Sequence, residues 1–246
     1  FFILILIVNY SLLASPSKFT VLIDPGHGGQ DQGTVQSSAA EADLVLQIAI
    51  KLQKKLYEKK KITALLTRST SKGVSLKERV DMANTLKADL FISLHANSST
   101  LPLIDGFEFY FNSHDPEKMF KTPPSNDIIN SQTDDVKASS QGENAQENLL
   151  SSSEIIKKIK NDFAYYEKTE KSLTLIKNLQ QELTKLNPNF SIKRSNFVMT
   201  DYTQIPTALI ELGFMTNKNE LEKLKSRQYQ EKLVESMITG IMSYLM

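Results

Sequence analysis

Long apolar runs that do not alternate with polar residues are the first pattern in this chain. Residues 19–23, 88–94 and 206–210 are three such runs, dominated by aliphatic residues and Phe. A strand with one face in water would alternate, so these runs indicate strands buried on both faces, as in the parallel sheets of α/β proteins. Residues 106–111 and a short stretch at 196–199 are predicted as further strands.

Apolar residues at three- and four-residue spacing predict helices between these strands. In residues 41–57 the spaced positions are Leu44, Val45, Ile48, Ala49, Leu52 and Leu56. Residues 172–186 form a second helical segment, which Asn187-Pro188 ends, and Asn217 begins the last one. The alternation predicts an α/β fold, a single domain with a twisted, mostly parallel (mixed) β-sheet flanked by helices.

An insert at residues 112–170 interrupts this alternation. Within it, residues 121–148 are rich in Ser, Asn, Gln, Asp and Pro, so they cannot bury enough apolar surface to order themselves and are expected to form a mobile loop. Residues 149–166 again carry apolar side chains at helical spacing, behind the capping candidates Ser151 and Ser153. We therefore predict an extra helix on a flexible tether.

The first fourteen residues are almost wholly apolar and are followed by Ser15-Pro16-Ser17. The run is shorter than the ~20 residues of a membrane-spanning helix and resembles the hydrophobic region of a signal peptide. We expect residues 1–17 to be a signal-peptide remnant or a retained N-terminal anchor, and residues 18–246 to be the catalytic domain. Either alternative predicts an exported protein.

Charge and cysteine content narrow the function. The net charge is +1 over 246 residues, which predicts no strong attraction to nucleic acid or to anionic membranes, so a membrane contact is expected only through an uncleaved N-terminal segment. The chain has no cysteine, which excludes disulfides and a cysteine nucleophile.

Candidate chemistry lies where the apolar runs end. His27, His95 and Glu211 each follow a predicted buried strand, and α/β sheets bind ligands at the carboxyl ends of their strands. Glu41 opens the first predicted helix, so a His, Glu, His set with an open fourth position is expected to hold one catalytic Zn²⁺. Taken singly, the histidines are also typical turn residues and Glu41 an ordinary first-turn acid. Glu211 is harder to explain so, because an unpaired buried carboxylate costs several kcal/mol.

The order of these motifs resembles a known family. Asp24-Pro25-Gly26-His27-Gly28-Gly29, a Glu at a helix start, Ser93-Leu94-His95-Ala96-Asn97 and Ile210-Glu211-Leu212-Gly213-Phe214 are similar to the motifs of the zinc-dependent N-acetylmuramoyl-L-alanine amidases of the amidase-3 type. The resemblance runs from about residue 19 to residue 246. It implies hydrolysis of the amide that joins muramic acid to L-alanine in peptidoglycan, with His27, Glu41 and His95 as zinc ligands and Glu211 as the catalytic carboxylate.

The resemblance also implies a setting for the reaction. The substrate would be peptidoglycan or muropeptides in wall remodelling, division or recycling, and the protein would act in the periplasm or cell envelope. In some members an inserted helix covers the zinc cleft and an activator protein displaces it. Residues 149–166 are therefore expected either to cover the cleft, with Glu154 or Asp162 as a blocking ligand, or simply to pack beside the sheet.

Other functions remain open from the sequence. A zinc peptidase that cuts within the stem peptide would use the same site, and a degenerate amidase would only bind peptidoglycan. A serine peptidase built on Ser-x-x-Lys would use residues 15–18 or 69–72, although no Lys-Thr-Gly accompanies them. His114 is expected at the surface in a polar turn, and Arg68 and Arg79 are expected outside the site.

Overall fold

A six-stranded sheet forms the centre of the protein in the computed structural model, which describes residues 19–58, 62–112 and 151–246. The sheet order is β4-β1-β5-β8-β6-β7. Its strands are β1 (Phe19–Pro25), β4 (Ile62–Leu66), β5 (Leu90–Asn97), β6 (Phe107–Asn112), β7 (Phe190–Ser195) and β8 (Thr207–Phe214). A separate two-stranded hairpin consists of β2 (Val35–Gln36) and β3 (Ala39–Ala40).

Strand direction is mostly parallel, as predicted. β1 pairs parallel with β4 and β5, β5 pairs parallel with β8, and β6 pairs parallel with β7. β6 and β8 pair antiparallel, which makes the sheet mixed. The predicted fold class is therefore confirmed, and the carboxyl ends of β1, β5 and β8 lie at one edge of the sheet.

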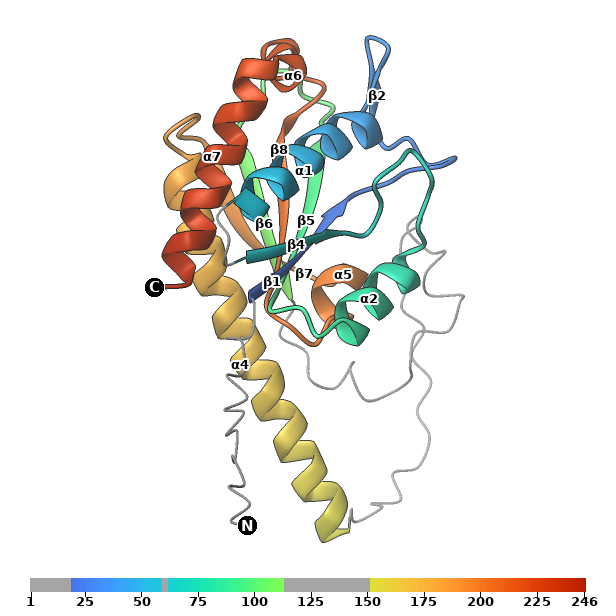
Figure 1. Ribbon diagram of the computed structural model, residues 1–246, viewed down its shortest axis with the longest axis vertical. Helices are drawn as coiled ribbons and strands as arrows, with labels where there is room; N and C mark the ends of the chain where they lie inside the picture. The colour runs from blue at the N-terminus through green and yellow to red at the C-terminus, as the bar shows by residue number, and fades with distance from the viewer. Residues whose placement is uncertain (1–18, 59–61, 113–150) are drawn as a thin grey trace, which may run out of the picture.

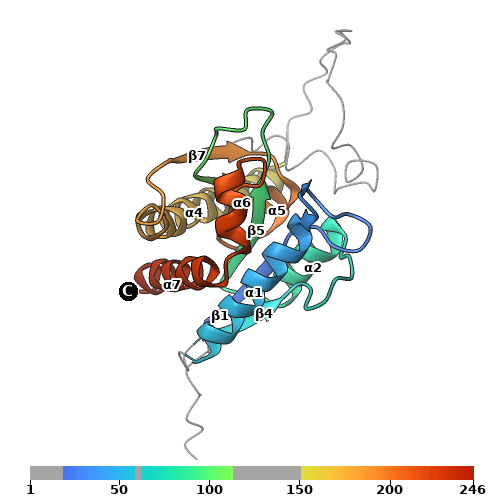
Figure 2. The same cartoon turned by 90° about the horizontal axis from the view of Figure 1, so that it is seen from above.

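Helices cover both faces of the sheet, which explains why its strands read as unbroken apolar runs (Figures 1 and 2). Val21 and Ile23 of β1 contribute to the larger core, which α1 (Glu41–Glu58), α6 (Lys218–Lys225) and α7 (Arg227–Tyr244) share. Leu22, between them, points to the opposite face and packs in a smaller core with α2 (Leu76–Thr85) and α5 (Val198–Tyr202). Alternate residues of one strand are thus buried in two different cores.

The helix α4 (Ser152–Leu183) corrects the expected arrangement of the insert. We predicted two helices, at 149–166 and 172–186, but the structure has one continuous helix of 32 residues. Lys168, Thr169 and Ser172 are polar and interrupt the apolar pattern in the sequence. In the structure all three are buried on the side of α4 that packs on the protein, so the buried face of the helix is continuous. From Tyr165 onward α4 packs beside the sheet and α7, while its first half extends past the sheet (Figure 1).

Two other boundaries differ from the prediction. Residues 196–199 are not a strand, because the chain turns there from β7 into α5. β7 was not predicted from the sequence, because no apolar run marks it. It is the edge strand beside β6, and its side chains are exposed or half-buried. Asn217 does begin the last helical stretch, as the N-cap of α6, and Ser226 divides that stretch into α6 and α7.

Some predictions concern residues outside the described ranges. These are the N-terminal segment 1–17, the loop 121–148 and the surface position of His114. Among the residues that the structure describes, no helix is long and apolar enough to cross a membrane.

Candidate active site

His27 lies in a glycine-rich turn directly after β1. Its backbone is left-handed, with φ 59°, and Gly28 and Gly29 continue the turn with φ 119° and 67°. The Gly26 N–H donates to the Leu94 carbonyl at 3.0 Å, which ties this turn to β5. A β-carbon at Gly26 would overlap the imidazole of His95, so the glycine leaves the space that this ring occupies.

Glu41 reaches the same place from the first turn of α1. The hairpin of β2 and β3 precedes it, and its side chain is buried, with 4% of the residue exposed. The Ala96 N–H donates to Glu41 Oε1 at 3.0 Å and the Thr34 N–H donates to Oε2 at 2.9 Å. These two backbone donors hold the carboxylate in one orientation without occupying a side chain of the site.

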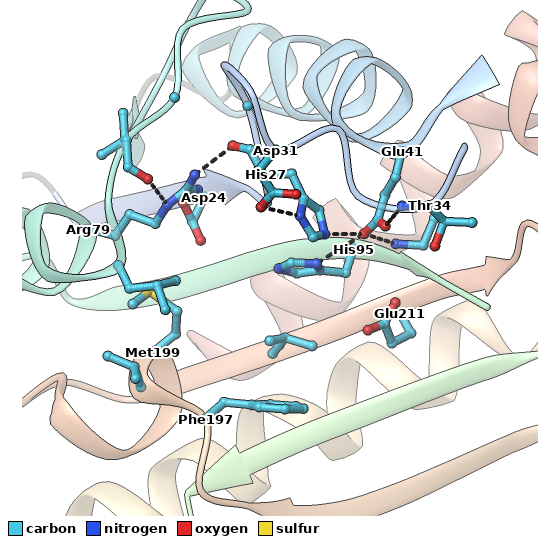
Figure 3. Close-up of a pocket in the computed structure, with 18 of the residues that line it drawn as sticks. Asp24, His27, Asp31, Thr34, Glu41, Arg79, His95, Phe197, Met199 and Glu211 are labelled. Carbon is cyan, nitrogen blue, oxygen red and sulfur yellow. Dashed lines mark hydrogen bonds and ion pairs between the residues drawn. The ribbon is translucent and has the colours of Figure 1, made fainter. Parts of the chain in front are cut away.

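The structure brings His27, Glu41 and His95 together, as the sequence predicted (Figure 3). Glu41 Oε1 lies 3.0 Å from His27 Nε2 and 3.1 Å from His95 Nδ1. The two imidazole rings meet edge to face, with centroids 4.9 Å apart. One donor atom from each residue lies within 4.8 Å of the others, and two imidazole nitrogens with a carboxylate oxygen are a donor set that suits a divalent metal.

Asp31 orients His27, and the sequence analysis did not identify it. Its Oδ2 accepts a hydrogen bond from His27 Nδ1 at 2.7 Å, and its Oδ1 accepts one from the Gly33 N–H at 3.0 Å. Nε2 of His27 is therefore the nitrogen that faces Glu41. A carboxylate bound to the far nitrogen of a histidine is typical of metal sites. In the sequence, only the spacing of four residues could have indicated this contact between His27 and Asp31. The two residues lie in a loop, where no helical or strand periodicity predicts that side chains four residues apart meet.

The electrostatics of the group favour a protonated His27 and an ionised Glu41. Burial opposes the charged form of His27, but hydrogen bonds and charges from Glu41 and Asp31 outweigh it and raise the pKa of His27 to about 9. Burial also opposes ionisation of Glu41, yet hydrogen bonds and positive charge from His27 and His95 hold the pKa of Glu41 well below its ordinary value. Without a metal, His27 and Glu41 therefore form a charged pair, and Glu41 also hydrogen-bonds to His95.

Glu211 lies beside this cluster with an unsatisfied atom. Among the described residues, its Oε2 is buried and has no hydrogen-bond partner. Burial is the main cause that raises the pKa of Glu211 to about 7, with the neighbouring charges of Glu41 and Glu108 adding to it and that of His95 opposing it. A buried polar atom without a partner costs free energy unless water or an ion satisfies it, so this oxygen indicates a bound group in the pocket.

His95 and Glu211 are held more rigidly than the sequence predicted. We expected both to follow their strands, but His95 lies within β5 and Glu211 within β8. Their positions are therefore fixed by strand hydrogen bonds rather than by loops.

The group opens into a pocket of about 720 Å³. On one side are the polar residues of the His27 loop and Glu41, and Asn97 and Ser98 continue this polar surface. Figure 3 shows Phe197 and Met199 on the other side of His95 and Glu211. The pocket thus combines a polar group suited to a metal with an apolar wall.

Arg68 and Arg79 hydrogen-bond to the backbone of the His27 loop and of the residues just before it. Arg68 donates to the carbonyls of Pro25 and Gly26 at 2.9 and 2.7 Å. Arg79 donates to the His27 carbonyl at 2.6 Å and forms a buried ion pair with Asp24. Arg79 also borders the pocket, but its donors are used within the protein.

The expected blocking ligands do not reach this group in the structure. No residue of α4 lines the pocket. The Glu154 carboxylate instead accepts from the backbone and hydroxyl of Ser151 at the start of α4, at 2.8 and 2.7 Å. The first half of α4 therefore does not cover the site in the described part of the chain.

Two imidazoles and a carboxylate at the carboxyl edge of an α/β sheet, with a second carboxylate beside them, define a candidate metal-dependent hydrolase site. Comparison with known families gives the class more narrowly. The family model described as N-acetylmuramoyl-L-alanine amidase (Amidase_3) matches residues 21–243, and the chain belongs to this family.

Individual relatives agree with the family. A putative N-acetylmuramoyl-L-alanine amidase of Buchnera aphidicola is 31% identical over 244 residues, covering 92% of this chain and 94% of the relative. The uncharacterized protein YqiI of Bacillus subtilis is 30% identical over 225 residues, covering 92% and 84%. The crystal structure of an N-acetylmuramoyl-L-alanine amidase from Clostridium difficile 630 is 27% identical, with a TM-score of 0.68 over 92% of this chain and 96% of that one. These findings confirm the predicted enzyme class, a peptidoglycan amidase, and its action on the wall implies export.

Proposed function

We propose that the protein is a zinc-dependent amidase in which His27, Glu41 and His95 hold one Zn²⁺ and Glu211 is the catalytic acid and base. The observation that carries the proposal is the buried, unpartnered Oε2 of Glu211, which borders the same pocket as the His27–Glu41–His95 group. The nitrogen and oxygen donors favour zinc over softer metals, because the chain has no cysteine to supply a thiolate.

The reaction needs a water, a metal and a proton carrier at one amide. Zinc, when bound, supplies acidification of a water molecule and polarisation of the scissile carbonyl. Glu211 accepts a proton from the attacking water, whose oxygen adds to the lactyl carbonyl carbon. The bond from this carbon to the L-alanine nitrogen then breaks, and Glu211 returns the proton to the leaving amine. The products are the lactyl carboxylic acid of muramic acid, which loses its proton to solvent or to the amine at neutral pH, and a stem peptide with a free amino terminus.

The environment of Glu211 suits both halves of this role. In the metal-free protein burial raises the pKa of Glu211 to about 7, so this carboxylate takes up a proton more readily than an exposed glutamate does. The neighbouring strand fixes the carboxylate beside His95, and Asp31 keeps the Nε2 of His27 directed to the metal group. Each residue therefore has a role that follows from its contacts.

We further propose that the enzyme acts in the periplasm or cell envelope and that an activator protein acts on the insert at residues 112–170. The described part of the insert offers a surface for such a partner. Ile155, Ile159 and Phe163 succeed one another at four-residue spacing on the first half of α4 and are 46, 61 and 68% exposed. Membrane contact would come only through an uncleaved N-terminal segment. Deleting residues 121–163 tests the regulatory role, because an inhibitory insert predicts higher basal activity after the deletion and an unchanged rate would exclude inhibition.

Product analysis tests the proposed activity. Purified muropeptides are digested with wild type and with Glu211→Ala, each with and without a zinc chelator, and the products are identified by mass spectrometry. Free stem peptide and intact sugar, lost on chelation and restored by added zinc, would support a zinc amidase, and their loss in the variant would support the role of Glu211. Peptides cut within the stem would show a peptidase instead. Binding without any product would favour a peptidoglycan-binding role.

A further inference from the structure

Lys168 is a buried cation in the middle of α4, outside the metal group. It is 5% exposed, and its Nζ donates to the carbonyl of Thr200 at 2.6 Å and to that of Asp201 at 3.2 Å. The ring of Tyr165 lies 5.8 Å from the same nitrogen. Burial lowers the pKa of Lys168 to about 7, while the charge of Asp201 opposes this shift. An ammonium group in such a place is costly, so its contacts matter to the structure around it.

Lys168 hydrogen-bonds to the carbonyls at the carboxyl end of the short helix α5. A helix of five residues leaves most of its carbonyls without a partner inside the helix. Side chains of α4 and α2, together with the C-cap residue Thr203, supply donors to these carbonyls. Lys168 of α4 donates to Thr200 and Asp201, Asn84 of α2 donates to the Tyr202 carbonyl at 3.2 Å, and the Thr203 hydroxyl donates to the Met199 carbonyl at 2.8 Å. A positive charge at a helix carboxyl end is also favourable to the helix dipole.

The other end of α5 forms the apolar wall of the pocket. Phe197, Val198 and Met199 all line it, and Figure 3 labels Phe197 and Met199. The Phe197 ring packs edge to face on Tyr110, with centroids 5.2 Å apart, and Met199 is 3% exposed. The proposed substrate carries a methyl group on each side of the scissile amide, on the lactyl group and on L-alanine, which an apolar wall suits.

We propose that Lys168 is a positioning residue for substrate: by fastening α5 to α4, it fixes the wall formed by Phe197, Val198 and Met199 and so sets substrate affinity. This inference rests on the proposed binding of substrate in this pocket. Lys168 does not line the pocket itself, and its contacts run to α5 and Tyr165 rather than to the metal group. Its effect should therefore appear in binding and leave the reacting groups unchanged.

Steady-state kinetics of the zinc-loaded enzyme on muropeptides test this role. Lys168→Met keeps most of the unbranched side chain, shorter by one atom, and removes its N–H donors. We expect KM to rise about fivefold or more while kcat changes less than about twofold. A displaced apolar wall weakens the binding of the substrate and of the transition state alike. The matched control is Lys171→Met, which removes an exposed lysine of the same helix, paired with Glu167, and should leave KM unchanged. Zinc content, measured for each protein, should stay the same.

A double-mutant cycle asks whether Lys168 acts through the wall. If it does, Lys168→Met should raise KM much less in a Met199→Ala background than in wild type. If Lys168→Met fails to fold, Lys168→Gln, whose side chain is about as long as that of Met, keeps two N–H donors and should give a smaller rise in KM. An unchanged KM, a fall in kcat alone, additive effects, or an equal effect of Lys171→Met would each overturn the proposal. An inactive wild type would instead contradict the proposed amidase function.

Discussion

His95 and Glu211 are register partners in the parallel ladder between β5 and β8. The candidate ligand and the candidate base therefore lie side by side, and backbone hydrogen bonds of two buried central strands fix their separation. Sites built on strands are held more firmly than sites built on loops. The three remaining residues of the site come from the His27 turn and the start of α1. There the glycines leave room for the side chains, and backbone N–H donors fix the orientation of the carboxylate.

Glu211→Gln tests the proton carrier while keeping the shape of the side chain. We expect kcat on muropeptides to fall about 10²–10⁴-fold, the range typical of a lost general acid or base. Zinc content, measured by elemental analysis, should remain one ion per chain because Glu211 is not in the ligand set. A variant with more than a tenth of wild-type kcat would assign the proton transfer to another group.

The same substitution should stabilise the metal-free protein, in a pH-dependent way. Because the folded-state pKa of Glu211 is raised from 4.5 to about 7, its contribution to stability is present below pH 4.5 and is lost as the pH rises through about 7. In excess chelator, Glu211→Gln should therefore raise the free energy of unfolding by about 1–3 kcal/mol at pH 8 and by much less at pH 4.5. Urea titrations at the two pH values measure this difference, and an equal difference at both would contradict it.

Asp31→Asn should weaken metal binding without removing a ligand. The amide cannot supply the negative charge that orients and polarises His27, so we expect zinc affinity to fall about 10–100-fold. Competition with a fluorescent chelator gives the affinity. Asp81→Asn is the matched control, since Asp81 is an exposed acid paired with Lys77 on α2 and should not affect zinc. Equal affinities for the Asp31 variant and wild type would make the contact to His27 irrelevant to the metal.

Gly26→Ala should disturb the site through His95. The added methyl group would overlap the imidazole, so the ring must leave its present position and zinc affinity should fall. The change should also destabilise the protein by about 1–3 kcal/mol, as overpacking of a filled site does. Thermal unfolding in chelator and zinc titration separate the two effects. Wild-type affinity together with wild-type stability would show that the loop adjusts freely.

The strands and helices that carry the site were predictable because they are buried in a regular way. β1, β5 and β8 are covered on both faces, and α1 is apolar along one side, so both patterns are strong in the sequence. The same physics explains the errors. Lys168 and Thr169 broke the apolar period of α4 because they are buried against polar partners, the carbonyls of α5 and the side chain of Asn112.

The residues of the site divide in the same manner. His27 follows β1 and Glu41 begins α1, whereas His95 and Glu211 lie in the second halves of β5 and β8, and the order of these elements along the chain predicts a common edge of the sheet. Asp31 contacts His27 only because the turn at Gly28 and Gly29 bends back on itself, with left-handed backbone that the sequence does not specify residue by residue. Contacts of this kind depend on loop geometry and become visible in the structure alone.

The site is also ordered in time. All three candidate ligands lie within the first 95 residues, whereas Glu211 follows more than a hundred residues later, on β8. During synthesis the ligands therefore leave the ribosome well before the base does. Because β8 lies between β5 and β6 in the sheet, the proposed ligands and the proposed base come together only once the C-terminal part of the chain has joined the sheet, so the proposed activity requires the whole domain to have folded.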